Sequence, residues 1–290
     1  MFTGALVALV TPFQDGEVDF QTLDELVDFQ LENGIDGIVP VGTTGECPTL
    51  SHEEHKQVIE RVVKAVGGQV PVIAGAGSNS TAEAIELAAF SKKVGADATL
   101  QVDPYYNKPT QEGFYQHFKA VAEEVDLPIV LYDIPGRCGA GMTPDTVVRL
   151  SEIENIVAIK DATGRLDQVS EIATRCDLTI LSGDDSLTLP IASVGGKGVV
   201  SVVANIVPAD VKAMTDLILE GDFTSALKWH KKLFTLCRNL LGLATNPIPI
   251  KAAMAMLDMA PEEMRLPMTP MDDSKKTILR QTLKAYGLIK

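Results

Sequence analysis

Apolar runs alternate with amphipathic stretches along the first three quarters of the chain. Eight short runs, rich in β-branched residues, have the pattern of strands that are buried on both faces of a parallel sheet. They lie at residues 5–13, 34–42, 70–77, 98–106, 128–135, 156–163, 178–183 and 198–205. The stretches between them carry apolar residues at helical spacing. This alternation predicts a (β/α)8 TIM barrel, with a doubly wound open sheet as the alternative.

Capping signals support the helices of this pattern. Ser51 with Glu54, and Ser80 with Glu83, both have the spacing of a capping box, in which two side chains satisfy free backbone N–H groups at a helix start. Each pair stands directly before a predicted helix. The two helices are therefore expected to begin beside residues 51 and 80.

The strand signal stops after residue 205. Residues 208–220 have the pattern of a last barrel helix, and residues 223–241 and 275–288 have that of further apolar-faced helices. We expect a catalytic barrel at residues 1–220 and a C-terminal helical extension at residues 221–290. The extension would cover the barrel or form a subunit contact.

Composition and charge exclude several classes of protein. Of the 290 residues, 46% are hydrophobic and 22% are charged, which is typical of a globular protein. A net charge of −14 argues against a nucleic-acid partner. No apolar run approaches the ~20 residues of a membrane-spanning helix, and the start of the chain lacks the pattern of a signal peptide. The four cysteines form no CxxC pair, which indicates reduced thiols in a cytoplasmic protein.

A lysine at the end of a buried strand is the most informative candidate for chemistry. Lys160 ends the apolar run of residues 156–160. Burial lowers the pKa of a lysine, and a neutral amine can attack a carbonyl to form a Schiff base. The alternative is a strand-end lysine whose ammonium reaches water. Taken alone, Lys160 favours the solvated strand-end lysine.

Other polar residues stand at equivalent strand ends, where barrel enzymes place their active sites. The turn at residues 42–46, GTTGE, offers hydroxyls and close backbone amides to an anion, or is an ordinary glycine-rich turn. Tyr132 could shuttle protons, or be a core aromatic with a bonded hydroxyl. Arg137 could clamp a carboxylate, or be a solvated loop residue. Each has its ordinary alternative, but their coincidence at successive strand ends indicates one site.

Metal chemistry lacks a coherent ligand set. His52 and His55 stand three residues apart near a helix start and are expected to be surface residues. Asp184 and Asp185 are expected to cap the following helix rather than to bind a metal. A metal-dependent aldolase is therefore the poorer version of the enzyme hypothesis, and we expect no metal and no organic cofactor.

The ordered motifs together resemble the pyruvate-dependent class I aldolases, the family of N-acetylneuraminate lyase. The resemblance runs the whole length of the chain. Its motifs are GTTGE at 42–46, PYYN at 104–107, YDIPGR at 132–137, IKDATG at 159–164, SGDD at 182–185, NPIPIK at 246–251 and RLPMTP at 265–270. The family resemblance implies a TIM barrel and a metal-independent reaction through a lysine Schiff base.

The resemblance also implies roles for individual residues. Lys160 would form the Schiff base with pyruvate, and Tyr132 would donate and accept protons. Thr43 would link Tyr132 to Tyr106, which reaches in from a neighbouring subunit. Thr44 and its backbone amide would bind the pyruvate carboxylate. A homotetramer built from tight dimers is therefore expected.

The second substrate is indicated by Arg137. Arg137 resembles the arginine with which the synthases of the family clamp the carboxylate of L-aspartate 4-semialdehyde. Sialic-acid lyases generally lack this arginine. Gly183 would line this pocket, and the carbonyl of Val200 would contact the lysine or pyruvate. Asp133 and Cys138 depart from the usual asparagine and threonine beside it. The implied reaction is the first committed step of diaminopimelate and lysine synthesis.

A second site is implied for an inhibitor. In family members inhibited by L-lysine, an allosteric pocket at a subunit interface uses matching positions. These are Pro48, His52, His55, Asn79, Glu83 and Tyr105.

Two alternative functions remain for the chain: an aldolase that acts on sugar acids, against which Arg137 argues, and a catalytically silent lysine-binding relative. Such a relative would be expected to have lost Lys160 or Tyr132, and both are present.

Overall fold

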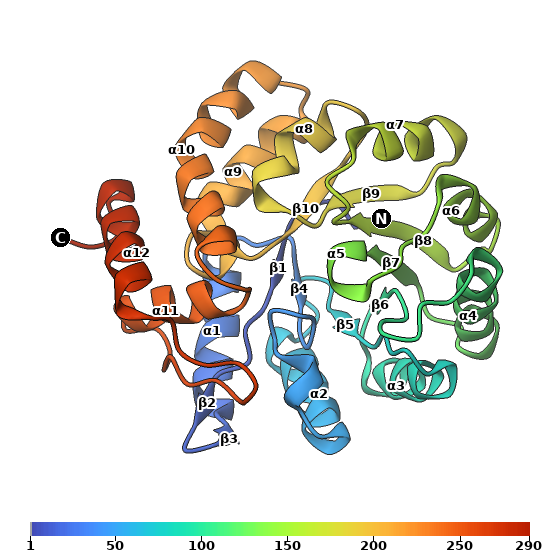
Figure 1. The fold of residues 1–290 in the computed structure, drawn as a ribbon, viewed down its shortest axis with the longest axis horizontal. Helices are drawn as coiled ribbons and strands as arrows, with labels where there is room; N and C mark the ends of the chain where they lie inside the picture. Colours follow the sequence, from blue (N-terminus) through green and yellow to red (C-terminus); the bar gives the residue numbers. More distant parts are fainter. Residues whose placement is uncertain (1) are drawn as a thin grey trace.

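Eight parallel strands form the centre of the molecule (Figure 1). The computed structural model describes residues 2–290. The strands are β1 (Gly4–Ala8), β4 (Gly37–Val39), β5 (Ile73–Gly75), β6 (Ala98–Val102), β7 (Ile129–Asp133), β8 (Ile156–Asp161), β9 (Thr179–Ser182) and β10 (Gly198–Ser201). They pair in the order β4-β1-β10-β9-β8-β7-β6-β5, and a parallel bridge between Ile38 and Val72 joins the two outer strands. The predicted (β/α)8 barrel is confirmed, and the open sheet is excluded.

Helices follow the strands and surround them. They are α1 (Phe20–Glu32), α2 (His52–Val66), α3 (Thr81–Val94), α4 (Gln111–Glu124), α5 (Pro135–Cys138), α6 (Pro144–Ser151), α7 (Leu166–Arg175), α8 (Thr188–Ala192) and α9 (Pro208–Leu219). The first predicted strand is too long, because the chain leaves the barrel after Ala8. Its last residues enter a short antiparallel hairpin of β2 (Phe13–Gln14) and β3 (Glu17–Val18).

Alternation along each strand separates two apolar layers. Leu6, Leu100 and Val130 belong to a cluster inside the barrel, whereas Val7, Leu131 and Ile159 pack outside it against the helices. Because both faces are buried, the strands read as continuous apolar runs in the sequence. The same alternation decides which side chains at the strand ends point into the barrel mouth.

Only one of the two predicted capping boxes forms. Ser51 and Glu54 make both reciprocal bonds at the start of α2. The Ser80 side chain makes no capping bond at the start of α3, so that prediction is wrong. Glu83 bonds instead to the hydroxyl of Ser78 and to the ring of His52. These two partners lie on the side of α3 that faces a cavity described below.

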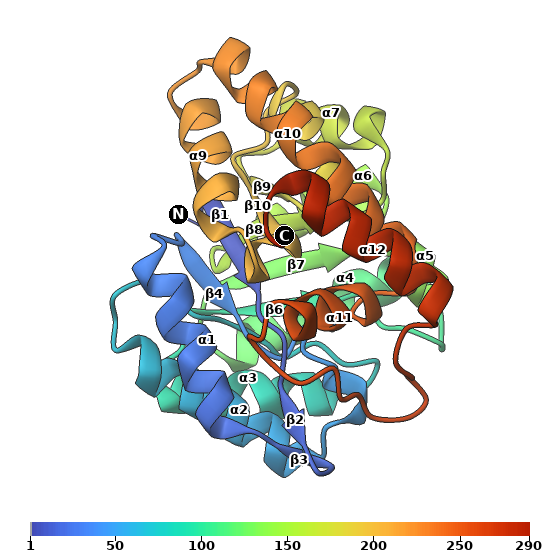
Figure 2. The same ribbon diagram turned by 90° about the vertical axis from the view of Figure 1, so that its left-hand side faces the viewer.

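Three further helices complete the chain: α10 (Phe223–Gly242), α11 (Ile248–Met256) and α12 (Asp273–Tyr286). Figures 1 and 2 show them together on one side of the molecule, next to α1 and α9. Leu236, Leu240 and Ile250 share one apolar cluster with residues of the barrel. A buried ion pair between Lys251 of α11 and Glu46 also joins the extension to the loop after β4. The extension is thus packed directly on the loops at the barrel mouth.

None of the helices formed by residues 2–290 is both long and apolar enough to cross a membrane.

Candidate functional site

A cavity of about 230 Å³ lies at the carboxyl ends of the strands. Its walls come from the ends of β7 and β8, from the loops after β4, β7, β8, β9 and β10, and from the end of α10 with the segment that follows it. The lining residues are Thr43, Thr44, Tyr132, Ile134, Arg137, Lys160, Ala162, Gly183, Asp184, Val202, Leu241, Thr245 and Asn246. The structure therefore brings together six of the predicted substrate-site residues, drawn from four separate motifs.

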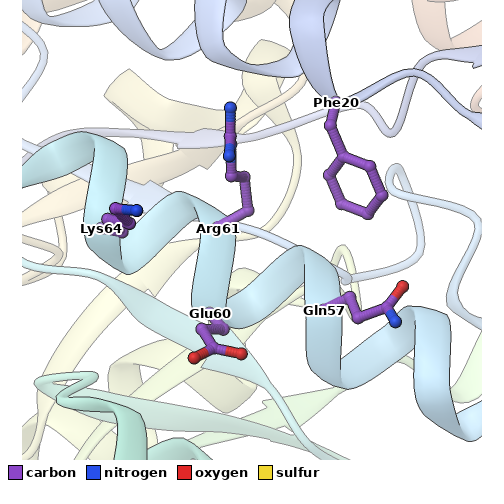
Figure 3. A pocket seen from close by; sticks show the side chains of 5 residues that line it. All are labelled: Phe20, Gln57, Glu60, Arg61 and Lys64. Carbon is purple, nitrogen blue, oxygen red and sulfur yellow. The ribbon is translucent and has the colours of Figure 1, made fainter.

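A larger cavity lies elsewhere and lacks comparable chemistry. It has about 430 Å³ and is a groove on the outer helices α1 and α2, lined by Phe20, Gln57, Glu60, Arg61 and Lys64 (Figure 3). The Arg61 guanidinium already forms an ion pair with Asp24. In Figure 3 the Glu60 carboxylate points away from Phe20 and Arg61, so the groove shows no convergent set of reactive groups.

Lys160 is buried at the base of the mouth cavity. Its side chain is 6% exposed, and its Nζ lies 4.0 Å from the ring centroid of Tyr132. The two residues are register partners on the adjacent strands β7 and β8. Burial lowers the pKa of Lys160 to about 7, while the nearby Asp185 carboxylate opposes the shift. A substantial share of this amine is neutral at neutral pH, which favours the nucleophile over the solvated strand-end lysine.

Tyr132 supplies a phenol at the same height. Burial raises its pKa to about 12, and a hydrogen bond with the Thr43 side chain partly offsets the shift. The phenol is therefore protonated at neutral pH and can donate. To accept a proton in turn, it needs a partner to which its own proton passes, and Thr43 is the hydroxyl in contact with it.

Asp185 has a role that the sequence analysis missed. Asp184 does cap the following turn, as predicted, by accepting from the Ser186 N–H at 2.9 Å. Asp185 is instead buried, and it accepts from the Val202 N–H at 2.9 Å and from the Ser201 hydroxyl. Burial raises the pKa of Asp185 to about 6. Its position beside Lys160 and β10 depends on the closure of the barrel, which no local pattern announces.

The loop after β4 and the C-terminal extension meet over the cavity. Asn246 donates from Nδ2 to Thr44 Oγ1 at 3.0 Å, and its carbonyl accepts from Arg137 Nη2 at 2.9 Å. The turn at residues 42–46 is held from behind by Thr11 Oγ1, which donates to the Gly45 carbonyl at 2.7 Å. The sequence indicated Asn246 only as part of a motif, because its contacts are with residues 109 and 202 positions away along the chain. It connects the two candidate carboxylate-binding residues.

Gly183 leaves no room for a side chain. A Cβ there would lie 2.7 Å from Ala162 Cβ, 3.0 Å from the Asp161 carbonyl and 3.1 Å from Lys160 Cε. We expect Gly183→Ala to displace the Lys160 side chain and to slow imine formation with pyruvate by about 10²-fold. Stopped-flow or trapping rates would measure this. Gly242→Ala is the control, because a Cβ at that residue meets nothing within 4 Å. Equal rates in the two variants would contradict the expectation.

Two of the predicted substrate-site residues do not line the cavity. Val200 is buried in β10, inside the barrel. Tyr106 is 88% exposed and its backbone is left-handed, with φ of 72°. Within one chain, the Tyr106 side chain therefore does not reach Thr43 to complete the predicted hydroxyl relay.

A third cavity gathers the predicted inhibitor residues. It has about 160 Å³, and Pro48, His52, His55, Glu83 and Tyr105 all line it. Asn79 lies beside it and donates to the Tyr105 carbonyl at 3.1 Å. Cys47 lines the same cavity, and it belongs to the loop after β4 that also supplies Thr43 and Thr44 to the mouth cavity. This cavity and the mouth cavity are therefore close neighbours.

The two histidines differ in this cavity. His52 is exposed and pairs with Glu83, its Nε2 lying 2.6 Å from Oε1. His55 is buried, contrary to the expectation of a surface residue, and its Nε2 lies 2.7 Å from the Gly75 carbonyl. Burial lowers the pKa of His55, which favours a neutral ring. Residues 2–290 contain no group of three or more His, Cys, Asp or Glu side chains arranged to hold a metal ion.

Known proteins resemble this chain over its full length. The model of the dihydrodipicolinate synthetase family matches residues 1–286. A protein of Methanocaldococcus jannaschii is 54% identical and one of Pelobacter propionicus is 53% identical, with complete coverage of both chains in each case. Both relatives are named 4-hydroxy-tetrahydrodipicolinate synthase.

Solved structures agree with this similarity. The chloride-inhibited dihydrodipicolinate synthase of Acinetobacter baumannii, complexed with pyruvate, has a TM-score of 0.97 at 44% identity, with both chains fully covered. A lysine-bound relative from Cyanidioschyzon merolae has a TM-score of 0.95 at 43% identity over 99% of both chains. A monomeric dihydrodipicolinate synthase variant has a TM-score of 0.97 at 39% identity, over 99% of this chain and 98% of its own.

Proposed function

The chain belongs to the dihydrodipicolinate synthetase family, and we propose that its family reaction proceeds through a Schiff base on Lys160. The chain is a lyase that condenses pyruvate with L-aspartate 4-semialdehyde to give 4-hydroxy-tetrahydrodipicolinate. The observation that carries the assignment of residues is the buried Lys160 amine over the Tyr132 ring, with Thr44 and Arg137 on the walls of the same cavity.

Lys160 begins the reaction. Its neutral amine attacks the carbonyl carbon of pyruvate, and loss of water gives the imine. The protonated imine draws electrons from the methyl group, which loses a proton and becomes an enamine. The phenol of Tyr132 lies next to the amine and is the group that delivers and removes these protons.

The second substrate then enters the outer part of the cavity. The enamine carbon attacks the aldehyde of L-aspartate 4-semialdehyde, forming the new carbon–carbon bond. The substrate's own amine next attacks the imine carbon, which closes the ring and releases Lys160. Arg137 holds the substrate carboxylate in this scheme, and Thr44 holds the carboxylate of pyruvate.

We propose that Tyr106 completes the site from a second subunit. In one chain its side chain is almost wholly exposed, although it follows directly after Tyr105 of the inhibitor cavity. A homotetramer built from tight dimers would cover it and place it against Thr43 of a neighbour.

We also assign the chain to the cytoplasm, since all four of its cysteines are free thiols.

A coupled assay tests the reaction itself. Pyruvate and L-aspartate 4-semialdehyde are supplied together with the downstream reductase, and the loss of NADPH is followed. Consumption that depends on both substrates supports the proposal. Silence, with a folded protein and an active reductase, would contradict it and favour an aldolase of sugar acids.

L-lysine is the inhibitor that suits the cavity around Glu83. The carboxylate of Glu83 can replace its His52 contact with the α-amino group of a bound amino acid, as a charge-assisted hydrogen bond. We expect Glu83→Gln to weaken L-lysine binding by about 10- to 100-fold in calorimetry, the range of one hydrogen bond to a charged group.

Glu86→Gln is the matched control for this expectation. Glu86 stands on the same helix, where it pairs with Lys56 at the surface outside the cavity. The Glu86→Gln variant should bind L-lysine with the same affinity as the unmodified chain. If the unmodified chain binds no L-lysine at millimolar concentration, this assignment of the cavity fails.

A further inference from the structure

Two buried carboxyl groups stand side by side behind the cavity. Asp103 follows β6 and Asp133 ends β7, and both are 0% exposed. The strands are in register there, since Val102 pairs with Tyr132 and the Asp103 N–H donates to the Tyr132 carbonyl at 3.0 Å. Tyr132 belongs to the interior of the barrel, so Asp133, the next residue, points to the opposite face.

Each carboxyl group lacks one partner. Asp103 Oδ2 accepts from the Ile134 N–H at 3.3 Å, and Asp133 Oδ2 accepts from Gln168 Nε2 at 2.9 Å. The Oδ1 atoms of both are buried without a donor among residues 2–290. The two carboxyl groups are themselves within hydrogen-bond distance of each other. One proton between them would satisfy both orphaned atoms.

The surroundings do not neutralise two negative charges. Among residues 2–290, no basic nitrogen lies within ion-pair distance of either carboxyl group. Asp161, on the neighbouring strand, adds a further buried carboxyl that is turned to Thr163, and Cys138 adds a thiol. Arg165 is the cationic group whose charge favours ionised Asp133. Burial and the charge of Asp133 raise the pKa of Asp103 well above its usual range.

Little space exists in which the pair could separate. A Cβ at Gly141 would lie 2.6 Å from Asp133 Oδ1, which means that the chain closes directly over this oxygen. The backbone carbonyl of Asp133 is fixed as well, because it accepts from the Ala162 N–H at 2.9 Å. Repulsion between two ionised carboxylates would therefore mainly displace Asp103 and the backbone groups that bond to Asp103.

Asp103 holds the turn that carries the substrate arginine. Its carboxyl group bonds to the N–H of Ile134, the residue from which α5 begins, and its carbonyl accepts from Cys138 Sγ at 3.3 Å. Between these two anchors lies Arg137, whose own N–H donates to the Ile134 carbonyl at 3.0 Å. Movement of Asp103 would thus shift Arg137, whereas Lys160 lies on a different strand.

We propose that Asp103 and Asp133 share a single proton, and that this proton positions Arg137 for the carboxylate of the second substrate. The two aspartates are positioning residues and do not touch substrate. The inference rests on the proposed function, because it takes Arg137 as the carboxylate clamp. Loss of the shared proton should weaken binding of L-aspartate 4-semialdehyde and spare imine formation with pyruvate.

The pH dependence of the two substrates tests this in the full-length protein. Because the pKa of the pair is raised, the shared proton is lost only at alkaline pH, and the KM for L-aspartate 4-semialdehyde should then rise by about two-fold or more between pH 8 and pH 10.5. In Asp133→Asn the amide donates a permanent hydrogen bond, so the rise should be absent. Titration of the substrate's own amine affects both proteins equally and cancels in their ratio. The KM for pyruvate should show no such difference.

Parallel slopes in the unmodified chain and in Asp133→Asn would overturn the inference. Asp103→Asn repeats the comparison from the other side of the pair and replaces it if Asp133→Asn does not fold. Reductive trapping of pyruvate on Lys160, run at each pH, distinguishes a failure of the positioning role from a failure of the Schiff-base reaction. Trapping without divergent slopes overturns only the positioning role, whereas absence of trapping overturns the proposed function and this inference with it.

Discussion

Replacing Lys160 with methionine should abolish condensation, with a fall in turnover of at least about 10⁴-fold. The variant keeps a long apolar side chain at a site where the native one is 6% exposed, so the barrel interior stays filled. It has no amine to form the imine, and among residues 2–290 no lysine other than Lys160 lines the cavity. The coupled assay measures the loss, and Lys197→Met, at an exposed lysine, serves as the control. Comparable turnover in the two variants would contradict the role of Lys160.

The same variant should be more stable than the unmodified chain. The folded protein holds Lys160 with a pKa of about 7 rather than 10.5, so protonation there costs a few kcal/mol of stability. This cost is fully present below pH 7 and disappears as the pH rises towards 10.5. Chemical denaturation at pH 6.5 should therefore give a higher free energy of unfolding for Lys160→Met, with a smaller difference at pH 9.5. A variant that is less stable at pH 6.5 would show that the amine is not held against its protonation.

Removal of one oxygen atom from Tyr132 should lower turnover by about 10²- to 10⁴-fold, the usual range of general acid–base catalysis. In Tyr132→Phe the ring that lies 4.0 Å from Lys160 Nζ is retained, and only the hydroxyl bonded to Thr43 is lost. Pyruvate should still bind. The loss should therefore appear in kcat, with little change in the KM for pyruvate.

Two companion variants sharpen this test. Thr43→Val removes the other half of the hydroxyl contact and should also lower kcat, because the phenol loses the group to which it passes its proton. Tyr115→Phe, which alters a tyrosine that packs against Arg149 on the outside of the barrel, should be neutral. An unchanged turnover number in Tyr132→Phe would remove the proton relay from the mechanism.

The barrel was predictable because its strands are buried on both faces. Every one of the eight apolar runs contains a strand, since a parallel sheet covered by helices leaves no polar face to interrupt the pattern. The error at the first run has a local cause. Residues after Ala8 remain apolar because they pack under the C-terminal helices, as Phe13 does, although they have left the sheet. The pattern of apolar residues indicates burial, and burial alone does not distinguish a strand of the sheet from buried residues outside it.

The site was predictable where its residues follow strands directly. Lys160 and Tyr132 were both predicted at the ends of successive strands, and the register places them opposite each other on β8 and β7. Asn246 and Asp185 could not be assigned in the same way. Asn246 reaches Thr44 across 202 residues, and Asp185 bonds to β10 only because the strands pair in the barrel order.

Competition between partners explains the failed capping box. Glu83 has the correct spacing from Ser80, but the hydroxyl of Ser78 and the ring of His52 offer it stronger contacts. His52 arrives from α2, and its approach depends on the packing of two helices. The spacing of Ser80 and Glu83 thus predicted the helix start correctly, but it did not predict the partners of the Glu83 carboxylate.

Reductive trapping of pyruvate shows whether Lys160 is the residue that forms the Schiff base. The protein is incubated with pyruvate and borohydride, digested, and mapped by mass spectrometry. The peptide with Lys160 should gain the mass of pyruvic acid less one oxygen atom. Trapping should decline as the pH falls below about 7, where the amine becomes protonated. Modification of a lysine other than Lys160, or the absence of any modification that depends on pyruvate, would contradict the role of Lys160.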